Sequence, residues 1–164
     1  MASLNRDIET LREQVEAGVV PRAYRGLIDY MNRLRTHFQN NVGGYSASGL
    51  YQGRMDYTFF SVFTPTLKKH SLKAGIMFNY SAFRFEVWLL GRNRSVQKEY
   101  WQRLSKMKWP KCRVSAPGPR VESILERDIA TRFNLDKPDL LTQTIENGVV
   151  VFVNDIEKAL QRNH

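Results

Sequence analysis

The stretch FRFEVWLLGRNRSVQKEYW, residues 83–101, changes its apolar period halfway along and therefore indicates two different elements. Its first half alternates with a period of two, which is typical of a strand at about 83–90. One face of that strand is formed by Phe83, Phe85, Val87 and Leu89. The other face carries Arg84, Glu86, Trp88 and Leu90.

The second half of the stretch is spaced like a helix. Gly91 is expected to end the strand, and Asn93 or Ser95 can cap the helix that follows. Its apolar stripe consists of Val96, Tyr100, Leu104 and Met107. The central unit is therefore a strand that turns directly into a helix.

Two more strands are predicted before this unit. Residues 55–63 and 72–80 are rich in aromatic and β-branched residues. The short link between 72–80 and 83–90 predicts a hairpin. The Gly-rich segment 40–53 is typical of a loop, and TPTLKKHS after residue 63 is expected to break the strand.

Helical spacing occupies both ends of the chain. A first helix is expected to end near Gly18, and a second spans about 21–40. After a short strand in KCRVSA, residues 121–129 fit either a strand or a helix. Two short helices, 138–147 and 149–162, are predicted on either side of Asn147–Gly148.

These elements predict one α+β domain over residues 1–164. The order is α-α-β-β-β-α-β-(β or α)-α-α, with helices packed on an antiparallel meander of three to five strands.

The charge is concentrated in the middle of the chain. The net charge is +9, to which residues 30–83 contribute +5 and residues 84–120 contribute +8. A cationic centre favours an anionic partner such as nucleic acid or a phosphorylated ligand, although Lys and Arg also solvate ordinary surfaces.

Composition also bears on disulfides, membrane helices and metal sites. A single cysteine, Cys112, excludes an internal disulfide and fits a reducing cytoplasm. No segment reaches the length and apolarity of a membrane helix. The three histidines and Cys112 show no metal-ligand spacing, so neither a cofactor nor a metal is expected.

The candidate binding residues lie in and around the basic centre. Glu86 is expected to need a partner from Arg84 or a neighbouring strand, either as a structural ion pair or as a ligand carboxylate. The full candidate set is Arg84, Glu86, Trp88, Arg92, Arg94, Lys98, Tyr45 and Tyr51. The tyrosines and Trp88 would supply stacking surfaces, and the arginines and Lys98 would bind an anion.

Arg92 and Arg94 occupy an unfavourable place for cations, at the start of a helix. We therefore expect them either to pair with acids such as Glu126 or Asp128, or to bind an anionic ligand.

A catalytic alternative rests on element order alone. One helix, three meander strands, a helix and a strand resemble the core of PD-(D/E)xK nucleases, which hold Mg²⁺ with carboxylates. Asp56 and Glu86 are the candidate acids here, but Trp88 stands where the motif requires lysine. The sequence leaves open whether the protein is an enzyme.

Several blocks resemble an uncharacterised bacterial family, a domain of unknown function. These blocks are AYRGLIDYMNRLRTHF (23–38), GLYQGRMDYTFF (49–60), RFEVWLLGRNRSVQKEYW (84–101) and IENGVVVFVNDIEKAL (145–160). The resemblance implies a bacterial cytoplasmic protein and carries no activity.

Three functional hypotheses remain. The first is a non-catalytic binding protein for an anionic partner, with nucleic acid the leading choice. The second is a divergent metal-dependent nuclease. The third is a homodimeric interaction module, because 12% aromatic content favours some exposed rings.

Overall fold

A computed structural model describes residues 2–162. The helices are α1 (Leu4–Glu16), α2 (Val19–Asn41), α3 (Pro65–Lys69), α4 (Arg94–Leu104) and α5 (Pro138–Arg162). The strands are β1 (Ser46–Ala47), β2 (Tyr57–Phe63), β3 (Leu72–Asn79), β4 (Arg84–Gly91), β5 (Arg113–Val114) and β6 (Ser123–Ala130). The predicted α+β architecture is confirmed.

The strands form one antiparallel sheet in the order β1-β2-β3-β4-β6-β5. The predicted hairpin is confirmed, with β3 and β4 paired from Leu72–Gly91 to Asn79–Arg84. β6 then pairs with the free edge of β4 after the chain has passed through α4. The sheet is therefore a meander, β1-β2-β3-β4, extended on its far side by β6 and then β5.

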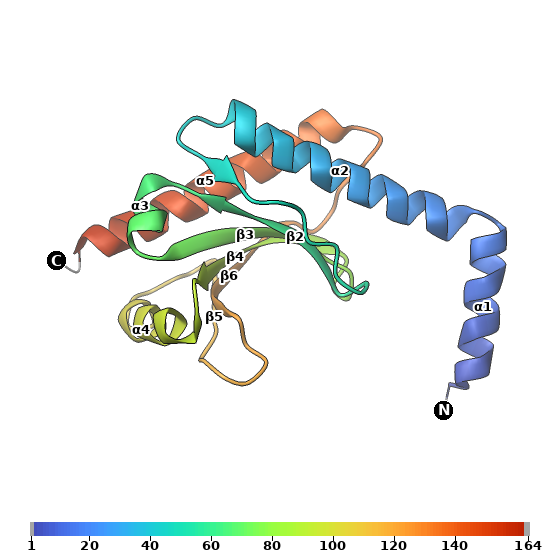
Figure 1. The fold of residues 1–164 in the computed structure, drawn as a ribbon, viewed down its shortest axis with the longest axis horizontal. Coiled ribbons are helices and arrows are strands. Elements are labelled where there is room, and N and C mark those ends of the chain that lie inside the picture. Colours follow the sequence, from blue (N-terminus) through green and yellow to red (C-terminus); the bar gives the residue numbers. More distant parts are fainter. Residues whose placement is uncertain (1, 163–164) are drawn as a thin grey trace.

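α2 and α5 lie together on one face of the sheet (Figure 1). The hydrophobic core is built there, from the alternate residues of each strand that point toward these helices. In β4 these residues are Phe85, Val87 and Leu89, all fully buried, as the alternation predicts.

The opposite face of the sheet is only partly covered. α4 lies on that side in Figure 1, against β4 and β6. Its predicted cap is confirmed, because the Asn93 side chain accepts a hydrogen bond from the Val96 amide at 2.9 Å. Tyr100 and Leu104 of α4 are buried. We call the uncovered part of this side the open face.

The C-terminal region departs from the prediction of two helices. α5 runs unbroken through Asn147–Gly148 for 25 residues. Gly148 is needed for close packing, because a Cβ atom there would lie 2.9 Å from Cγ2 of Ile129 on β6. Gly148, which the sequence pattern predicts to end a helix, is thus a contact point between α5 and the sheet.

Three smaller differences have local causes. The ambiguous segment 121–129 is a strand, β6, because it completes the sheet beside β4. The strand break after residue 63 holds the helix α3, capped by the Thr64 hydroxyl, which accepts from the Leu67 amide. Phe83 does not join the core face: it sits in the β3–β4 turn with φ 55° and is 57% exposed.

α1 stands apart from the rest of the domain. Figure 1 shows it leaving the end of α2 at a sharp bend, at Gly18, where φ is 78°. All 13 of its residues are described, and none of them is buried. No helix within residues 2–162 is long and apolar enough to cross a membrane.

Candidate binding groove

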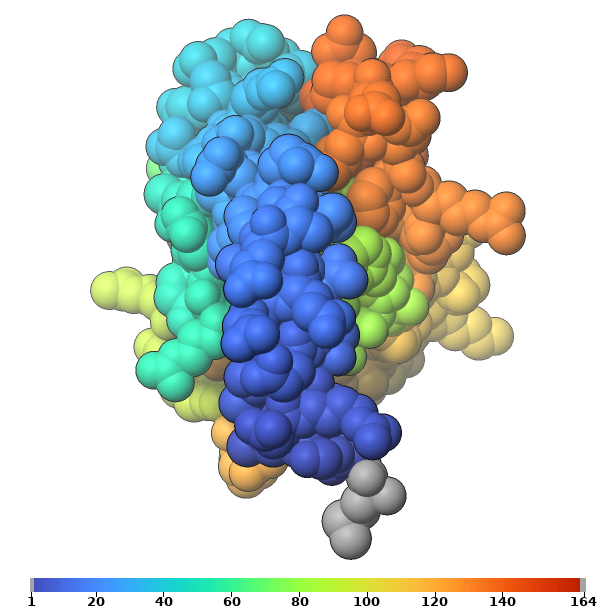
Figure 2. Space-filling view, turned by 90° about the vertical axis from the view of Figure 1, so that its right-hand side faces the viewer, coloured from blue at the N-terminus to red at the C-terminus, as the bar shows by residue number. Residues whose placement is uncertain are grey.

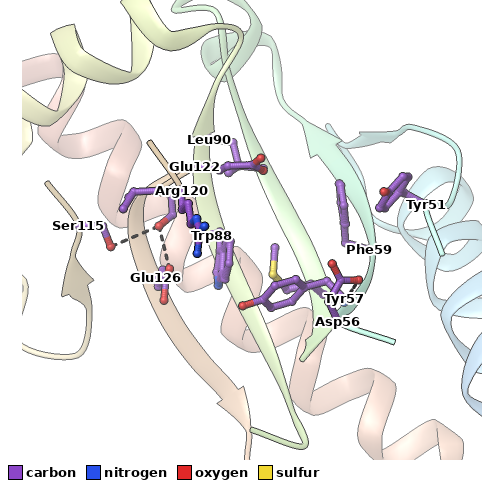
Figure 3. Close-up of a pocket in the computed structure, with 13 residues that line it drawn as sticks. Tyr51, Asp56, Tyr57, Phe59, Trp88, Leu90, Ser115, Arg120, Glu122 and Glu126 are labelled. Carbon is purple, nitrogen blue, oxygen red and sulfur yellow. Dashed lines mark hydrogen bonds between the residues drawn. The ribbon is translucent and has the colours of Figure 1, made fainter. Parts of the chain in front are cut away.

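A hollow of about 490 Å³ lies on the open face of the sheet (Figure 3). We call it the aromatic pocket. Its lining residues are Tyr51, Asp56, Tyr57, Phe59, Met77, Trp88, Leu90, Ser115, Arg120, Val121, Glu122, Ser123 and Glu126.

The floor of the aromatic pocket follows from strand alternation. Tyr57 and Phe59 on β2, Met77 on β3, and Trp88 and Leu90 on β4 all point away from the helices. The strand register brings these positions side by side, since Phe59 pairs with Met77 and Gly75 pairs with Trp88.

Ring contacts hold the aromatic side chains in place. Tyr57 meets Trp88 edge-on with ring centroids 5.1 Å apart, and Tyr51 meets Phe59 at the same separation. Tyr51 is 57% exposed and forms one wall. The pocket therefore offers ring faces that are both ordered and accessible.

Carboxylates line the other walls. Glu122 and Glu126 lie near Arg120 on the side opposite Tyr51 (Figure 3). Asp56 closes the end, and its pKa is lowered because it accepts hydrogen bonds from the amides of Arg54 and Tyr57. The pKa of Tyr57 is raised, first by burial and then by the charges of Glu86 and Glu126. The pocket thus combines apolar rings with hydrogen-bond acceptors.

Glu86 lies beside this pocket, does not line it, and is 1% exposed. Its Oε2 accepts from Arg84 Nε at 2.6 Å and from Asn79 Nδ2 at 3.2 Å, and its Oε1 accepts from Trp88 Nε1 at 2.9 Å. Arg84 is therefore the partner of Glu86, as expected. Asn79 on β3 and Trp88 on β4 are two further donors to the same carboxylate. This environment anchors Trp88 and orients its ring.

The ion pair extends across the edge of the sheet. Arg84 also contacts Asp128 at 3.2 Å. Arg113 on β5 contacts Asp128 at 2.8 Å and Glu126 at 3.2 Å, and lies 3.8 Å from Glu86. Burial alone would lower the pKa of Arg113, but its bonds with Asp128 and Glu126 raise it. Arg113 was not among the candidate binding residues, because it lies on a two-residue strand and its local pattern does not distinguish it from the other basic residues of 84–120.

Arg94 does not pair with Glu126 or Asp128, contrary to one expectation. Its guanidinium instead donates to the backbone carbonyls of Gly118 and Val121 and to the side chain of Gln97. Carbonyl oxygens carry partial negative charge, so they offset part of the unfavourable interaction of the cation with the helix start without neutralising its charge. Arg94 is therefore committed to holding the loop before β6.

A second hollow, of about 330 Å³, is basic. Its lining residues are Phe63, Lys68, Ser71, Leu72, Lys73 and Arg92. Within residues 2–162, no acid lies within 4.0 Å of the charged atoms of Lys68, Lys73 or Arg92. Three cations thus face one hollow without a counter-ion. We call it the basic pocket.

The basic pocket is assembled by the β3–β4 pairing. Leu72 pairs with Gly91 and Lys73 with Leu90, so the start of β3 lies beside the end of β4. The Arg92 amide donates to the Ser71 carbonyl at 2.9 Å and fixes that junction. Once the hairpin is predicted, its register places Lys73 opposite Leu90 and so makes Arg92, two residues further on, its diagonal neighbour on the same face.

A third hollow joins the two pockets. It shares Phe59, Leu90 and Glu122 with the aromatic pocket, and it shares Lys73 with the basic pocket. The three form one groove along the open face, from Tyr51 and Trp88 at one end to Arg92 at the other. Five residues of β3, Lys73 to Met77, span it, and their four steps correspond to about 13 Å.

The remaining candidates are scattered. Tyr45 is partly buried and packs against Phe38 of the core, with ring centroids 5.9 Å apart, and it lines none of the three hollows. Lys98 is exposed on α4 and lines none of the hollows described here.

The two acids of the nuclease alternative are engaged separately. Asp56 accepts from backbone amides at the start of β2, whereas Glu86 is held by Arg84, Asn79 and Trp88. Residues 2–162 contain no group of three or more His, Cys, Asp or Glu side chains placed to hold a metal ion.

A comparison with protein-family models gives a match over most of the chain. A family model described as Domain of unknown function (DUF7000) covers residues 4–160. No curated protein and no solved structure matches the chain.

Proposed function

The chain belongs to this family of domains of unknown function, and we propose a function from the groove. The protein binds a nucleotide-containing ligand in the groove and does not catalyse a reaction on it. The heterocyclic base occupies the aromatic pocket, and the phosphate occupies the basic pocket. The observation that carries this proposal is the continuity of the two pockets through Phe59, Leu90 and Lys73.

The aromatic pocket suits a base on chemical grounds. Every nucleobase has a flat π face, and stacking on an aromatic side chain contributes about 1–3 kcal/mol per base. Tyr51 and Trp88 present such faces on the floor and wall. A ring of this kind would be sandwiched between β2 and the loop that carries Arg120.

The acidic side chains of the aromatic pocket favour a ligand whose ring carries hydrogen-bond donors at its edge. A purely apolar or anionic ring would meet the carboxylates of Glu122 and Glu126 unfavourably. Exocyclic amines and ribose hydroxyls are donors, and carboxylates accept from them. The pocket therefore favours a base and sugar over a simple aromatic acid.

The basic pocket supplies the anion site. Lys68, Lys73 and Arg92 converge from α3, β3 and the end of β4 and have no acid beside them. Lys68 lies 5.6 Å from the centroid of the Phe63 ring, but none of the three cations has a counter-ion, which a phosphate would supply to all three. The groove is open at this end, so the phosphate of a free nucleotide and that of a nucleic-acid strand present the same chemistry.

The test is a binding titration with nucleic-acid strands and with free nucleotides. Fluorescence anisotropy with labelled single-stranded RNA, single-stranded DNA and duplex DNA covers the polymers. Calorimetry with mononucleotides covers the free ligand. We expect single strands or mononucleotides to bind, with an affinity for single strands that falls with salt by a slope of about 0.7 per phosphate contact.

Matched variants locate the binding. Lys73→Ala and Arg92→Ala should each weaken binding and reduce the salt slope for single strands by about 0.7. Tyr51→Ala should weaken binding about 5- to 150-fold, which is the stacking free energy expressed as an affinity ratio. Lys137→Ala, at an exposed lysine just before α5, is the control and should have no effect. Absence of binding to every probe at low salt, or equal loss with the control, would refute the proposal.

A further inference from the structure

The first helix carries an apolar stripe that its own domain leaves uncovered. Leu4, Ile8, Leu11 and Val15 are 75%, 51%, 52% and 46% exposed. Figure 1 shows α1 extending away from the sheet and its covering helices, and Figure 2, viewed from that side, shows it as the foremost element. The stripe is thus accessible over the whole length of the helix.

A helix in this position needs a partner to be stable. Thirteen residues make a helix about 20 Å long, and isolated helices shorter than about 12–15 residues are marginal in water. The ion pairs of Arg12 with Glu9 and Glu16, at 3.5 and 3.6 Å, are exposed and add little. The apolar stripe is the remaining source of stabilisation, and it acts only when it is covered.

The spacing of the stripe identifies the partner. The intervals 4–8, 8–11 and 11–15 follow the alternation of four and three residues of a heptad seam. Ile8 and Val15 then fall at a positions, and Leu4 and Leu11 fall at d positions. β-Branched residues at a with leucine at d favour parallel two-stranded coiled coils. We propose that α1 pairs in parallel with α1 of a second copy of this chain.

The flanking charges support the same arrangement. With this heptad, Asp7 occupies a g position and Arg12 occupies the e position five residues later. In a parallel pair, each Asp7 faces Arg12 of the other copy, which gives two complementary ion pairs. In an antiparallel pair, g faces g and e faces e, so these opposite charges would not meet.

The bend at Gly18 makes the pairing sterically reasonable. A parallel pair has its two-fold axis along the helices, so the two α2 helices diverge from the same end. Because the chain bends sharply between α1 and α2, α1 projects away from the rest of its own domain (Figure 1). The seam has only four apolar layers, so we expect dissociation in the micromolar range.

Analytical ultracentrifugation of the full chain over about 1–300 µM, which brackets a micromolar constant, tests the pairing. The expected mass rises from 19.1 kDa to twice that value with concentration. Ile8→Asp should leave a monomer at every concentration, whereas Thr10→Asp, away from the seam, should leave the dimer intact. A wild-type monomer throughout, or a dimer that Ile8→Asp does not affect, would overturn the inference.

Charge exchange and crosslinking test the parallel orientation. Asp7→Arg should weaken the dimer, and adding Arg12→Asp should restore it, while Glu13→Arg on the outer face should have no effect. In a Cys112→Ala background, Ile8→Cys should form a disulfide dimer under mild oxidation, since a positions face each other only in a parallel, in-register pair. A stable dimer that resists this crosslink would exclude the proposed arrangement. Unchanged thermal unfolding of the monomeric variants verifies that the domain itself remains folded.

Discussion

Replacing the carboxylate of Glu86 with an amide tests whether its network holds the open face together. Glu86→Gln preserves the shape of the side chain, so no cavity forms. All three hydrogen-bond partners of Glu86 are donors: Arg84, Asn79 and Trp88. A glutamine has one accepting oxygen, so its NH₂ group must face a donor on one side.

The magnitude follows from what is lost and what remains. One hydrogen bond to a charged group is lost, which costs about 1.5–3 kcal/mol. Arg84 keeps Asp128 at 3.2 Å, so its charge is still compensated. We expect Glu86→Gln to lower the free energy of unfolding by about 2 kcal/mol. Glu86→Ala removes the acceptor of all three donors and leaves Arg84 with Asp128 alone, so we expect it to lower the free energy of unfolding by about 3–5 kcal/mol.

Urea denaturation followed by circular dichroism measures these changes, and thermal melting provides a second measurement. For a chain of this size, a loss of about 2 kcal/mol lowers Tm by about 4–8 °C. Glu99→Gln, at an exposed acid of α4, is the matched control and should stay within about 0.5 kcal/mol of wild type. If Glu86→Gln also stays within that range, the carboxylate is not a structural anchor and the reasoning fails.

Three other changes probe separate parts of the fold. Gly148→Ala should destabilise the protein despite a gain in helix propensity, because the added Cβ would crowd Ile129. Gly26→Ala, with open space around the added Cβ, should instead stabilise the protein by about 0.5–1 kcal/mol. Calorimetric melting of the two variants compares these effects. Burial and the charge of Glu157 raise the pKa of Tyr45 from its ordinary 10.0 to about 12, so the folded state retains a proton that the unfolded state loses, and stability should fall between about pH 10 and 12. Tyr45→Phe should reduce that fall in urea titrations at each pH, and an unchanged slope would contradict the assignment. Asn93→Ala should cost about 1 kcal/mol through loss of the α4 cap, measured by the same denaturation assay.

Local patterns predicted the fold where one signal dominated. Alternation over 83–90 identified β4 and its buried face, and the Asn93 cap set the start of α4. Gly148 misled because glycine both ends helices and permits close packing, and only the position of Ile129 on β6 distinguishes the two roles. The segment 121–129 stayed ambiguous because its pairing partner lies more than 30 residues earlier.

The candidate groove was predicted in part. Trp88, Tyr51 and Arg92 were named from composition and periodicity, and each lines one of the pockets. Lys73 was missed, although the β3–β4 register would have placed it beside Arg92. The pairing of Arg94 with backbone carbonyls could not be foreseen, because it depends on the path of an irregular loop.

The outer strands of the sheet also bear on how the protein behaves at high concentration. β1 and β5, which flank the sheet, are each two residues long. Long unpaired edges template strand addition and lead to amyloid-like aggregation, whereas short ones offer few free amides and carbonyls to a neighbouring chain. Arg113 adds a charge to the β5 edge. We therefore expect self-association of the folded chain to be helix-mediated and reversible, and concentrated samples to resist conversion to fibrils.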